Sequence, residues 1–395
     1  MLRLLSVPTI MLCLATATAS AVTVEPGAVR LEKEAGMDVV PDEVSDNVEA
    51  QVEADSKTNK KKRNGEFVVA PLPSRSPLLG WSIGLPIMYI YKPSGSDEKD
   101  RPWVSGGAGF YTESESYGAG LFHKMSTGGD KWRLMGSAFA ARLQYDYFGI
   151  GSNGDGFQIP IDQRLKIVVV EALRQSWWDN FFVGLRYAYS QTKVETTFGE
   201  GLLPGDRDPI TIGRDYTLSS IIPRAVYDTR ENEFYPTQGW LIEGQIGLGM
   251  KELGSDTDYE KLEVYINDYR SLTKKGVLAT RIATKYIGGD APFFLYPAFG
   301  AGADLRGYNT GTYRDRFLFS AQTEYRYRIT PRNGIVGFIG IGTVADEFGK
   351  WGDSLPSVGA GYRFVLAPKN NVSLRVDIAR GKDDSEFYVG IGEAF

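Results

Sequence analysis

After Asn64 the chain repeats one pattern, a run of about ten residues with alternating apolar and polar side chains followed by turn residues. Alternation with period two is typical of a strand with one apolar and one polar face, and about ten residues suffice for a tilted strand to cross a bilayer. The pattern predicts strands at 66–70, 81–91, 102–112, 117–125, 132–145, 161–173, 180–194, 216–227, 240–250, 259–269, 277–287, 317–328, 334–344, 358–364, 372–379 and 386–395.

Several of these runs separate charge from aliphatic side chains cleanly. In 277–287, Ile282 shares its parity with other apolar or small residues, whereas Arg281 and Lys285 have the opposite parity. In 317–328, Tyr325 and its apolar parity partners oppose a row that contains Glu324. One face therefore suits lipid and the other a wet, charged interior, as in a transmembrane barrel.

Composition excludes two other classes of protein. No apolar run after the N-terminus approaches the roughly 20 residues of a membrane helix, so a helical membrane protein is excluded. The net charge is −5 and both signs are mixed along the chain, so nothing indicates a nucleic-acid partner.

The first 64 residues differ from the rest. Residues 1–21 combine Arg3, an apolar centre and a small-residue end at Ala21, which predicts a secretory signal peptide. The only cysteine, Cys13, lies in this leader; a lipidated cysteine there is an alternative that its bulky neighbours disfavour. Residues 22–64 are acidic and poor in large apolar side chains, which predicts a disordered periplasmic tail. Its closing basic cluster could contact anionic lipid or simply be solvated. The barrel is expected over residues 65–395.

Turn lengths orient the predicted barrel. Bacterial barrels have an even number of strands, with short periplasmic turns and longer outer loops. If the C-terminus lies in the periplasm, the short first run 66–70 completes sixteen strands, and residues 288–315 form an outer loop. Five tryptophans then fall at periplasmic strand ends, as in an aromatic girdle. They are Trp103, Trp132, Trp177, Trp178 and Trp240.

The long outer loop contains Leu305-Arg306-Gly307-Tyr308. An arginine among small and apolar residues often reaches a partly buried polar partner, and Glu324 on the following strand is the predicted partner. The alternative is that Arg306 caps the loop in water.

These residues resemble the BamA/TamA-type bacterial surface antigen family of sixteen-stranded outer-membrane barrels, which insert proteins into the membrane or move them across it. The resemblance covers Phe67 to Phe395 and is carried by Leu305-Arg306-Gly307-Tyr308, by Asp228-Thr229-Arg230 with Pro236-Thr237-Gln238-Gly239, by Glu324-Tyr325-Arg326, by Tyr147-Phe148-Gly149-Ile150-Gly151 and by the terminal Phe395.

The resemblance implies a loop folded into the lumen, with Arg306 docked on acidic residues of the twelfth and thirteenth strands. The thirteenth strand departs from the family by carrying Gly340 where an aspartate is usual. Asp304 and Asp346 are the candidates for the second acidic contact. Residues 22–64 are too few and too acidic for a POTRA domain, so a member without this periplasmic platform is expected.

The C-terminal run resembles the signal by which barrels are recognised for insertion. Its one-parity row consists of Phe387, Val389, Ile391 and Phe395, with Glu393 interrupting the outward side. The short first strand and this last strand would meet at a seam with few hydrogen bonds, the family's proposed lateral gate. The expected partners are outer-membrane lipid and lipopolysaccharide, the barrel-assembly machinery and a possible protein substrate.

No cofactor, metal site or enzymatic activity is expected. His123 is the only histidine, and a barrel hydrolase would need a serine and an orienting group beside it; Ser116 and Ser126 are near in sequence. The acidic loop 151–156 could bind calcium but lacks the final glutamate of an EF-hand. The sequence favours a protein or lipid insertion or translocation role in the outer membrane of a Gram-negative bacterium. The alternative is a passive structural barrel or narrow pore.

Overall fold

A computed structural model describes residues 65–76, 79–147, 159–198, 210–300, 304–309, 311–383 and 385–395. Within them seventeen strands form one sheet. The strands are β1 (Gly65–Val69), β2 (Leu72–Ser76), β3 (Gly80–Tyr91), β4 (Trp103–Thr112), β5 (Tyr117–Thr127), β6 (Trp132–Tyr147), β7 (Ile159–Gln175), β8 (Phe181–Phe198), β9 (Ile210–Asp228), β10 (Gly239–Gly249), β11 (Tyr259–Thr273), β12 (Gly276–Gly289), β13 (Phe317–Arg328), β14 (Asn333–Ala345), β15 (Leu355–Ala367), β16 (Val372–Arg380) and β17 (Ser385–Ile391).

Two short 3-10 helices, η1 (Lys251–Leu253) and η2 (Phe293–Leu295), lie in the loops. No helix among the described residues is long and apolar enough to span a bilayer. The predicted leader 1–21, the predicted tail 22–64 and the loop 151–156 lie outside the described residues, as does nearly all of the stretch 147–151.

β1 and β2 are two halves of one strand. Both pair with β3 in a single register, with Val69 opposite Ile87 and Leu72 opposite Gly84. The break between them contains Pro71, and β3 carries Pro86 at the same level. Proline has no N–H to donate to a ladder, so this level of the first strand pair is weakly bonded. Counting the two halves once gives sixteen strand positions, which confirms the predicted number.

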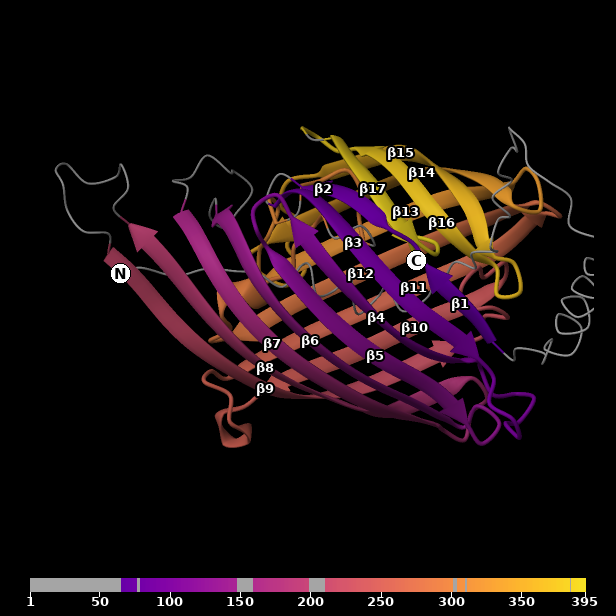
Figure 1. Ribbon diagram of the computed structural model, residues 1–395, viewed down its shortest axis with the longest axis horizontal. Coiled ribbons are helices and arrows are strands. Elements are labelled where there is room, and N and C mark those ends of the chain that lie inside the picture. Colours follow the sequence, from indigo (N-terminus) through magenta and orange to yellow (C-terminus); the bar gives the residue numbers. More distant parts are fainter. Residues whose placement is uncertain are drawn as a thin grey trace, which may run out of the picture.

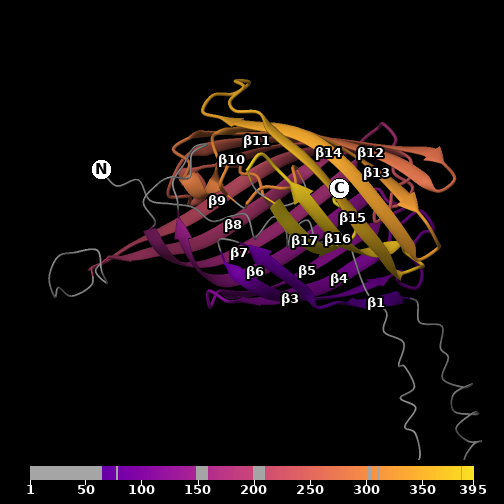
Figure 2. The same ribbon diagram turned by 90° about the horizontal axis from the view of Figure 1, so that it is seen from above.

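The strand order closes on itself. Each position pairs with the next in the chain, β9 pairs with β10, and β17 is the neighbour of β2. Figures 1 and 2 show β3 to β9 and β10 to β14 as opposite walls that cross at an angle and enclose an interior. The all-β, sixteen-position antiparallel barrel is therefore confirmed.

The two faces of the strands follow the predicted parity. The outward row of β14 includes Ile339, 60% exposed, and that of β16 includes Ile378, 64% exposed. The inward row of β13 is buried throughout its polar stretch, from Ser320 through Gln322 and Glu324 to Arg326. The barrel thus has an apolar exterior and a charged lumen.

Several strands are longer than the alternation predicted, and the three longest strands of the barrel are among them. β7, β8 and β9 have 17, 18 and 19 residues and extend past their neighbours at the left of Figure 1. Their outer ends are rich in charged residues and threonine, as in Lys193–Phe198. Such segments have no apolar face to detect, yet they still satisfy their backbone groups by pairing in water.

The β9–β10 turn reaches across the inner mouth of the barrel. Phe234 packs in one cluster with Val68 of β1 and Met88 of β3, although β9 and β10 lie half a barrel away from these strands. Glu233 of the turn pairs with Lys124 of β5 at 2.6 Å and with Arg101 at 3.1 Å. Burial alone would raise the pKa of Glu233, but the neighbouring cations outweigh it and hold the pKa well below its usual range.

An arginine placed on the outward row should destabilise the barrel according to its depth. We expect Ile339→Arg, at the middle of β14, to cost about 2–4 kcal/mol, whereas Ile329→Arg, beyond the inner end of β13, should cost about 0–1 kcal/mol. Denaturant unfolding of the two variants in lipid vesicles, followed by tryptophan fluorescence, measures the difference. Equal costs at the two positions would show that β14 does not cross the hydrocarbon.

Candidate functional site: a loop docked in the lumen

The outer loop between β12 and β13 carries the candidate site. Its residues Leu305, Arg306 and Tyr308 are almost completely buried, and the side chain of Arg306 is 0% exposed. The buried cluster around them contains Leu318 of β13 and Leu355 of β15. The loop therefore lies inside the barrel against its C-terminal wall.

Three polar groups hold the Arg306 guanidinium. Nη2 donates to Glu324 Oε2 at 2.5 Å, Nη1 donates to Asp377 Oδ2 at 2.7 Å, and Nε donates to Gln322 Oε1 at 3.2 Å. The guanidinium carbon also lies 3.4 Å from the ring centroid of Phe338. Two carboxylates and a stacked ring offset the desolvation of the buried cation.

One of the two acids is the residue that the sequence indicated, Glu324 on β13. The second is Asp377 on β16, so the candidates Asp304 and Asp346 were wrong. Asp304 instead pairs with Arg281 and Lys285, and Asp346 pairs with Lys350 in an exposed loop. Asp377 was identifiable as lumen-facing from its parity, but parity alone does not show which lumen residues meet.

The Arg306 contacts belong to a closed ring of alternating charges. From Arg306 the ring runs through Glu324, Arg326, Glu393, Arg363 and Asp377 back to Arg306, with N–O distances between 2.5 and 3.8 Å. The longest link joins Arg326 to Glu393. Three cations and three anions cancel, so the ring joins the loop, β13, β15, β16 and the C-terminal tail without net charge.

Glycines determine how closely the loop can approach the wall. Gly307 has φ +101°, and a Cβ there would lie 2.7 Å from the backbone of Arg380 and Gly381. A Cβ at Gly340 would lie 2.7 Å from Leu305. Leu305 thus packs against Gly340, the residue at which this chain departs from the family pattern.

Backbone and hydroxyl groups complete the dock. The Gly307 N–H donates to the Tyr388 hydroxyl of β17 at 2.9 Å, and Ser357 donates to the Arg306 carbonyl at 2.5 Å. The Tyr308 hydroxyl donates to the Pro356 carbonyl and accepts from the Lys382 N–H at 3.2 Å. Loop 290–316 is therefore attached to every strand from β13 to β17 by side-chain contacts rather than by strand pairing.

A second ion pair anchors the loop on its other side. Asp304 accepts from Arg281 of β12 at 2.9 Å and pairs with Lys285 of the same strand. Burial alone would raise the pKa of Asp304, but the charges of Lys285 and Arg281 outweigh it and hold the pKa well below its usual range. The loop carboxylate is therefore ionised while the loop is docked.

The C-terminal tail does not continue the last strand. β17 ends at Ile391, and Gly392 has φ +85°, so the expected strand 386–395 was too long. Glu393 enters the lumen and pairs with Arg363 at 2.7 Å instead of interrupting the outward row. Phe395 leaves that row as well, because its carbonyl accepts from Arg326 at 2.7 Å. Phe387 keeps its outward position and is 41% exposed, and Val389 and Ile391 are half-buried.

Because the chain turns into the lumen after Ile391, β17 does not extend into the inner half of the seam. At this level Glu66 of β1 accepts a hydrogen bond from Asn370 in the β15–β16 turn at 2.6 Å. At the seam β17 is the hydrogen-bonded neighbour of β2, which has only five residues, whereas the neighbouring pair of β16 and β17 is registered over seven residues, Arg380 to Leu374.

His123 has a serine neighbour that the sequence analysis missed. Ser105, directly opposite on β4, lies 2.8 Å from His123 Nδ1, and Trp103 packs edge-on against the imidazole. The cross-strand register was the missing information. No group of three metal-ligand residues occurs in the described part of the chain.

Comparison with known proteins identifies the same architecture. The Omp85 superfamily domain profile matches residues 103–395. No curated protein sequence matches the chain.

Solved barrels with low sequence identity share the fold. A crystal structure of BamA from Haemophilus ducreyi lacking POTRA domains 1–3 has a TM-score of 0.53 and 15% identity, over 84% of this chain and 70% of that one. CdiB from Escherichia coli has a TM-score of 0.58 and 10% identity, over 84% and 62%. CdiB from Acinetobacter baumannii has a TM-score of 0.53 and 13% identity, over 83% and 60%. The chain thus spans less than two thirds of the two CdiB chains.

Removing one charge from the ring should destabilise the barrel strongly. We expect Glu324→Gln, which keeps the side-chain shape, to cost about 3–5 kcal/mol because it leaves buried cations uncompensated. The matched change Asp353→Asn breaks an exposed pair with Lys382 and should cost less than about 1 kcal/mol. Denaturant midpoints in lipid compare the two, and a small effect of Glu324→Gln would mean that the ring does not hold the loop.

Gly307→Ala tests the close approach of the loop separately from charge. The left-handed φ and the backbone overlap together should cost about 2–4 kcal/mol. Gly254→Ala has a similar φ of +86° with nothing within 4 Å of the added Cβ, so it should cost only about 1–2 kcal/mol of backbone strain. Limited proteolysis of loop 290–316 should show faster cleavage for Gly307→Ala alone; equal cleavage rates would argue against a tight dock.

Proposed function

Because the chain belongs to the Omp85 superfamily, we propose that it inserts or translocates protein segments or lipid at the outer membrane of a Gram-negative bacterium. The observation that carries the proposal is the docked loop, whose Arg306 ring includes residues of β15, β16 and the C-terminal tail. The loop that closes the lumen is thereby tied to the strands beside the seam.

The seam is the weakest boundary of the barrel. β8 and β9 are paired over eighteen residues, from Phe181 to Phe198, whereas β17 has seven residues and adjoins a first strand interrupted at Pro71. Separation at the seam therefore breaks far fewer backbone hydrogen bonds than separation of β8 from β9. This difference supports lateral opening as the route by which a substrate strand or lipid passes.

The charge ring supplies a coupling between plug and seam. Arg363 and Arg326 hold Glu393 and the Phe395 carbonyl in the lumen, away from the plane of β17. If the loop undocks, Asp377 and Glu324 lose Arg306, and the pairs that hold the tail are weakened. A single element with two arrangements then links the lumen plug to the last strand.

A passive structural barrel or narrow pore is the second candidate. The observation that favours it is that buried clusters lie at both ends, one around loop 290–316 in the outer half and one around Phe234 at the inner mouth. A barrel that is sealed and anchored by satisfied buried ion pairs could serve without moving. Conductance would then rise on loop removal, while blocking the seam would have no effect.

For its own insertion we propose that the chain uses the barrel-assembly machinery, through its C-terminal residues. Phe387, Val389 and Ile391 form the outward row of β17, and Phe395 would join them while the tail is still extended. Outer-membrane lipid and lipopolysaccharide are the proposed surroundings, and an unfolded outer-membrane protein is the proposed substrate class.

Blocking the seam by a cross-link tests the proposal. Glu66→Cys with Asn370→Cys places two thiols at the hydrogen-bonded seam contact, and residues 22–395 contain no other cysteine. After reaction with a short bifunctional maleimide in lipid vesicles, we expect at least about a tenfold loss in the rate at which the protein accelerates folding of a urea-unfolded small barrel, because the seam can no longer open.

A second cross-link provides the matched control. Thr280→Cys with Thr323→Cys joins β12 and β13, where the two hydroxyls lie 3.0 Å apart far from the seam. This link should leave the rate within about twofold. Equal activity of the seam-linked and control-linked proteins would refute lateral opening, and absence of any acceleration by the wild type would favour the passive barrel.

A further inference from the structure

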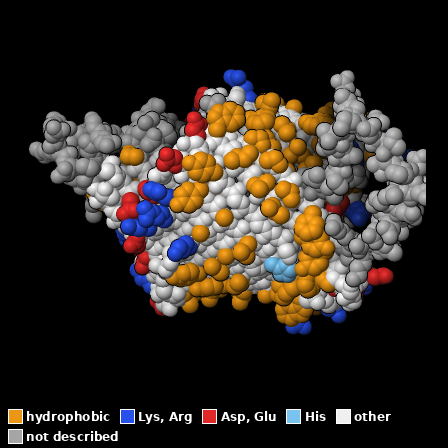
Figure 3. All heavy atoms as spheres, in the orientation of Figure 1, with side chains coloured by type: hydrophobic (Ala, Val, Ile, Leu, Met, Phe, Trp, Pro, Cys, Tyr) orange, Lys and Arg blue, Asp and Glu red, His pale blue; other side chains and the backbone are white. Residues whose placement is uncertain are grey.

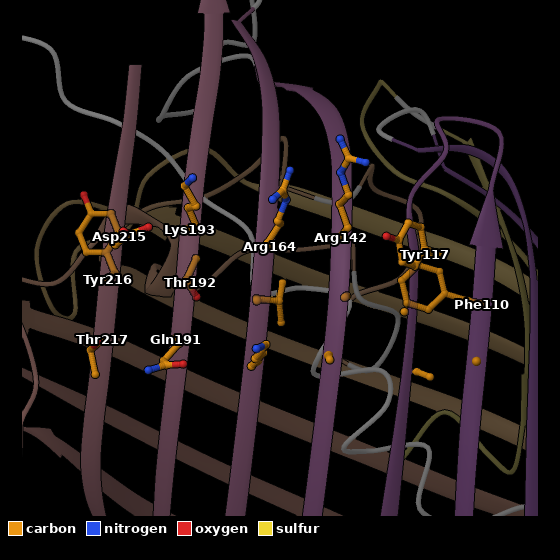
Figure 4. A pocket seen from close by; sticks show the side chains of 17 residues that line it. Phe110, Tyr117, Arg142, Arg164, Gln191, Thr192, Lys193, Asp215, Tyr216 and Thr217 are labelled. Atoms are coloured by element: carbon orange, nitrogen blue, oxygen red, sulfur yellow. The ribbon is translucent and has the colours of Figure 1, made fainter. Parts of the chain in front are cut away.

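A row of cations crosses three neighbouring strands on the outside of the barrel. The registers place Arg142 of β6 opposite Arg164 of β7, and Arg164 opposite Lys193 of β8. All three point outward, because their chain neighbours Leu143, Leu165 and Val194 are buried in the lumen cluster. Figure 4 shows the three side chains side by side, extending toward the outer ends of their strands.

The row lies at the outer edge of the apolar belt. On β7 the outward residues Val168 and Val170 are 47% and 49% exposed, followed by Lys166 and Arg164 toward the outer end. Figure 3 shows blue and red side chains gathered toward the left edge of this face and orange ones mainly over its upper, right and lower parts. The cations thus lie where the lipid headgroups of the outer leaflet begin.

The strand geometry gives the same depth independently. Trp132 begins β6 at the inner end, and Arg142 follows ten residues later on the same outward row. At about 3.3 Å per residue and a tilt of about 40°, ten residues span about 25 Å along the membrane normal, which is the height of a barrel's apolar band. The row therefore lies one hydrocarbon thickness from the tryptophan that marks the inner interface.

The protein itself neutralises this row only partly. Asp162 pairs with Arg142 at 2.6 Å but with Arg164 at 3.9 Å, and Glu195 pairs with Lys193 at 2.8 Å. Arg164, in the middle, is 56% exposed. Like charges placed directly opposite one another destabilise a sheet, so an anion that bridges the three side chains would be stabilised.

The space beside the row suits a headgroup. A groove of about 1270 Å³ lies between this row and the next outward row, which contains Lys166, and Tyr117 and Asp215 stand at its two ends. The small outward side chains of Ala119 and Ala140 widen it beneath Arg142. Arginine forks bind phosphate oxygens bidentately, and Asp215 leaves a site for a hydroxyl donor such as a sugar.

We propose that Arg142, Arg164, Lys193 and Lys166 bind the phosphate groups of a phosphorylated glycolipid of the outer leaflet, such as lipid A. This site goes beyond the proposed transport function, because it requires only that the barrel crosses the membrane. It holds β6 to β8, on the wall away from the seam, at a fixed depth and orientation in the outer leaflet.

Lipid binding by the full chain in nanodiscs tests the site. The probes are diphosphorylated lipid A, its dephosphorylated form and inorganic phosphate, and affinities are measured by native mass spectrometry and by displacement of a fluorescent lipid A. We expect Arg142→Gln/Arg164→Gln/Lys193→Gln to weaken lipid A binding at least about tenfold, and Arg164→Gln alone about threefold. Wild-type affinity should fall with added salt.

A charge-matched variant and a fold check complete the experiment. Lys131→Gln/Arg270→Gln/Lys275→Gln removes three exposed cations near the inner ends of strands and should leave binding within about twofold. Heat-modifiable gel mobility verifies that each variant is folded, and Arg164→Gln serves if the triple variant is not. Unchanged binding by the folded variants, equal binding of dephosphorylated lipid A, or binding of inorganic phosphate as tight as that of lipid A would overturn the proposal.

Discussion

The buried guanidinium of Arg306 is the constraint on which the C-terminal half of the barrel depends. An unpaired cation in a narrow lumen would be costly, and its two carboxylates come from β13 and β16. These strands can face the same loop residue only if the sheet between them curves. The closed ring of charges can therefore form only when the sheet is curved into a barrel. Once formed, the ring holds the loop to the barrel wall.

The alternation of side chains predicted most of the fold, because the period-two signal and the burial of one face arise from the same physics. Glu324 could be selected as a partner of Arg306 because only eighteen residues separate them. Asp377 lies 71 residues away from Arg306, and its contact depends on the curvature across three strand pairs. Parity gives the face of a residue, whereas its partner across the lumen depends on register and curvature together.

The C-terminus shows where a row of equal parity ceases to be a strand. Phe387, Val389, Ile391 and Phe395 share one parity in the sequence, but Gly392 permits a left-handed turn, and Arg363 and Arg326 draw Glu393 and the Phe395 carbonyl inward. The lumen charges outweigh the remaining ladder bonds of β17 at that point. The alternation within a single strand contains no information about ion pairs with distant strands, so it could not predict this turn.

Outward charges carry a second kind of information, which is depth. Between Trp132 and Arg142 the outward row of β6 contains no charge, and the same is true of β7 between Lys166 and Arg174, which lies opposite Trp132. A charge in this interval would face hydrocarbon, so its bounds record the thickness of the membrane. Lumen charges are chosen by partners inside the barrel, whereas the outward cations of β6 to β8 are positioned by the surrounding lipid. Asp215 lies opposite Lys193 in the register, so Arg142, Arg164, Lys166 and Lys193 face three acids, Asp162, Glu195 and Asp215. The lipid is the proposed source of the remaining negative charge.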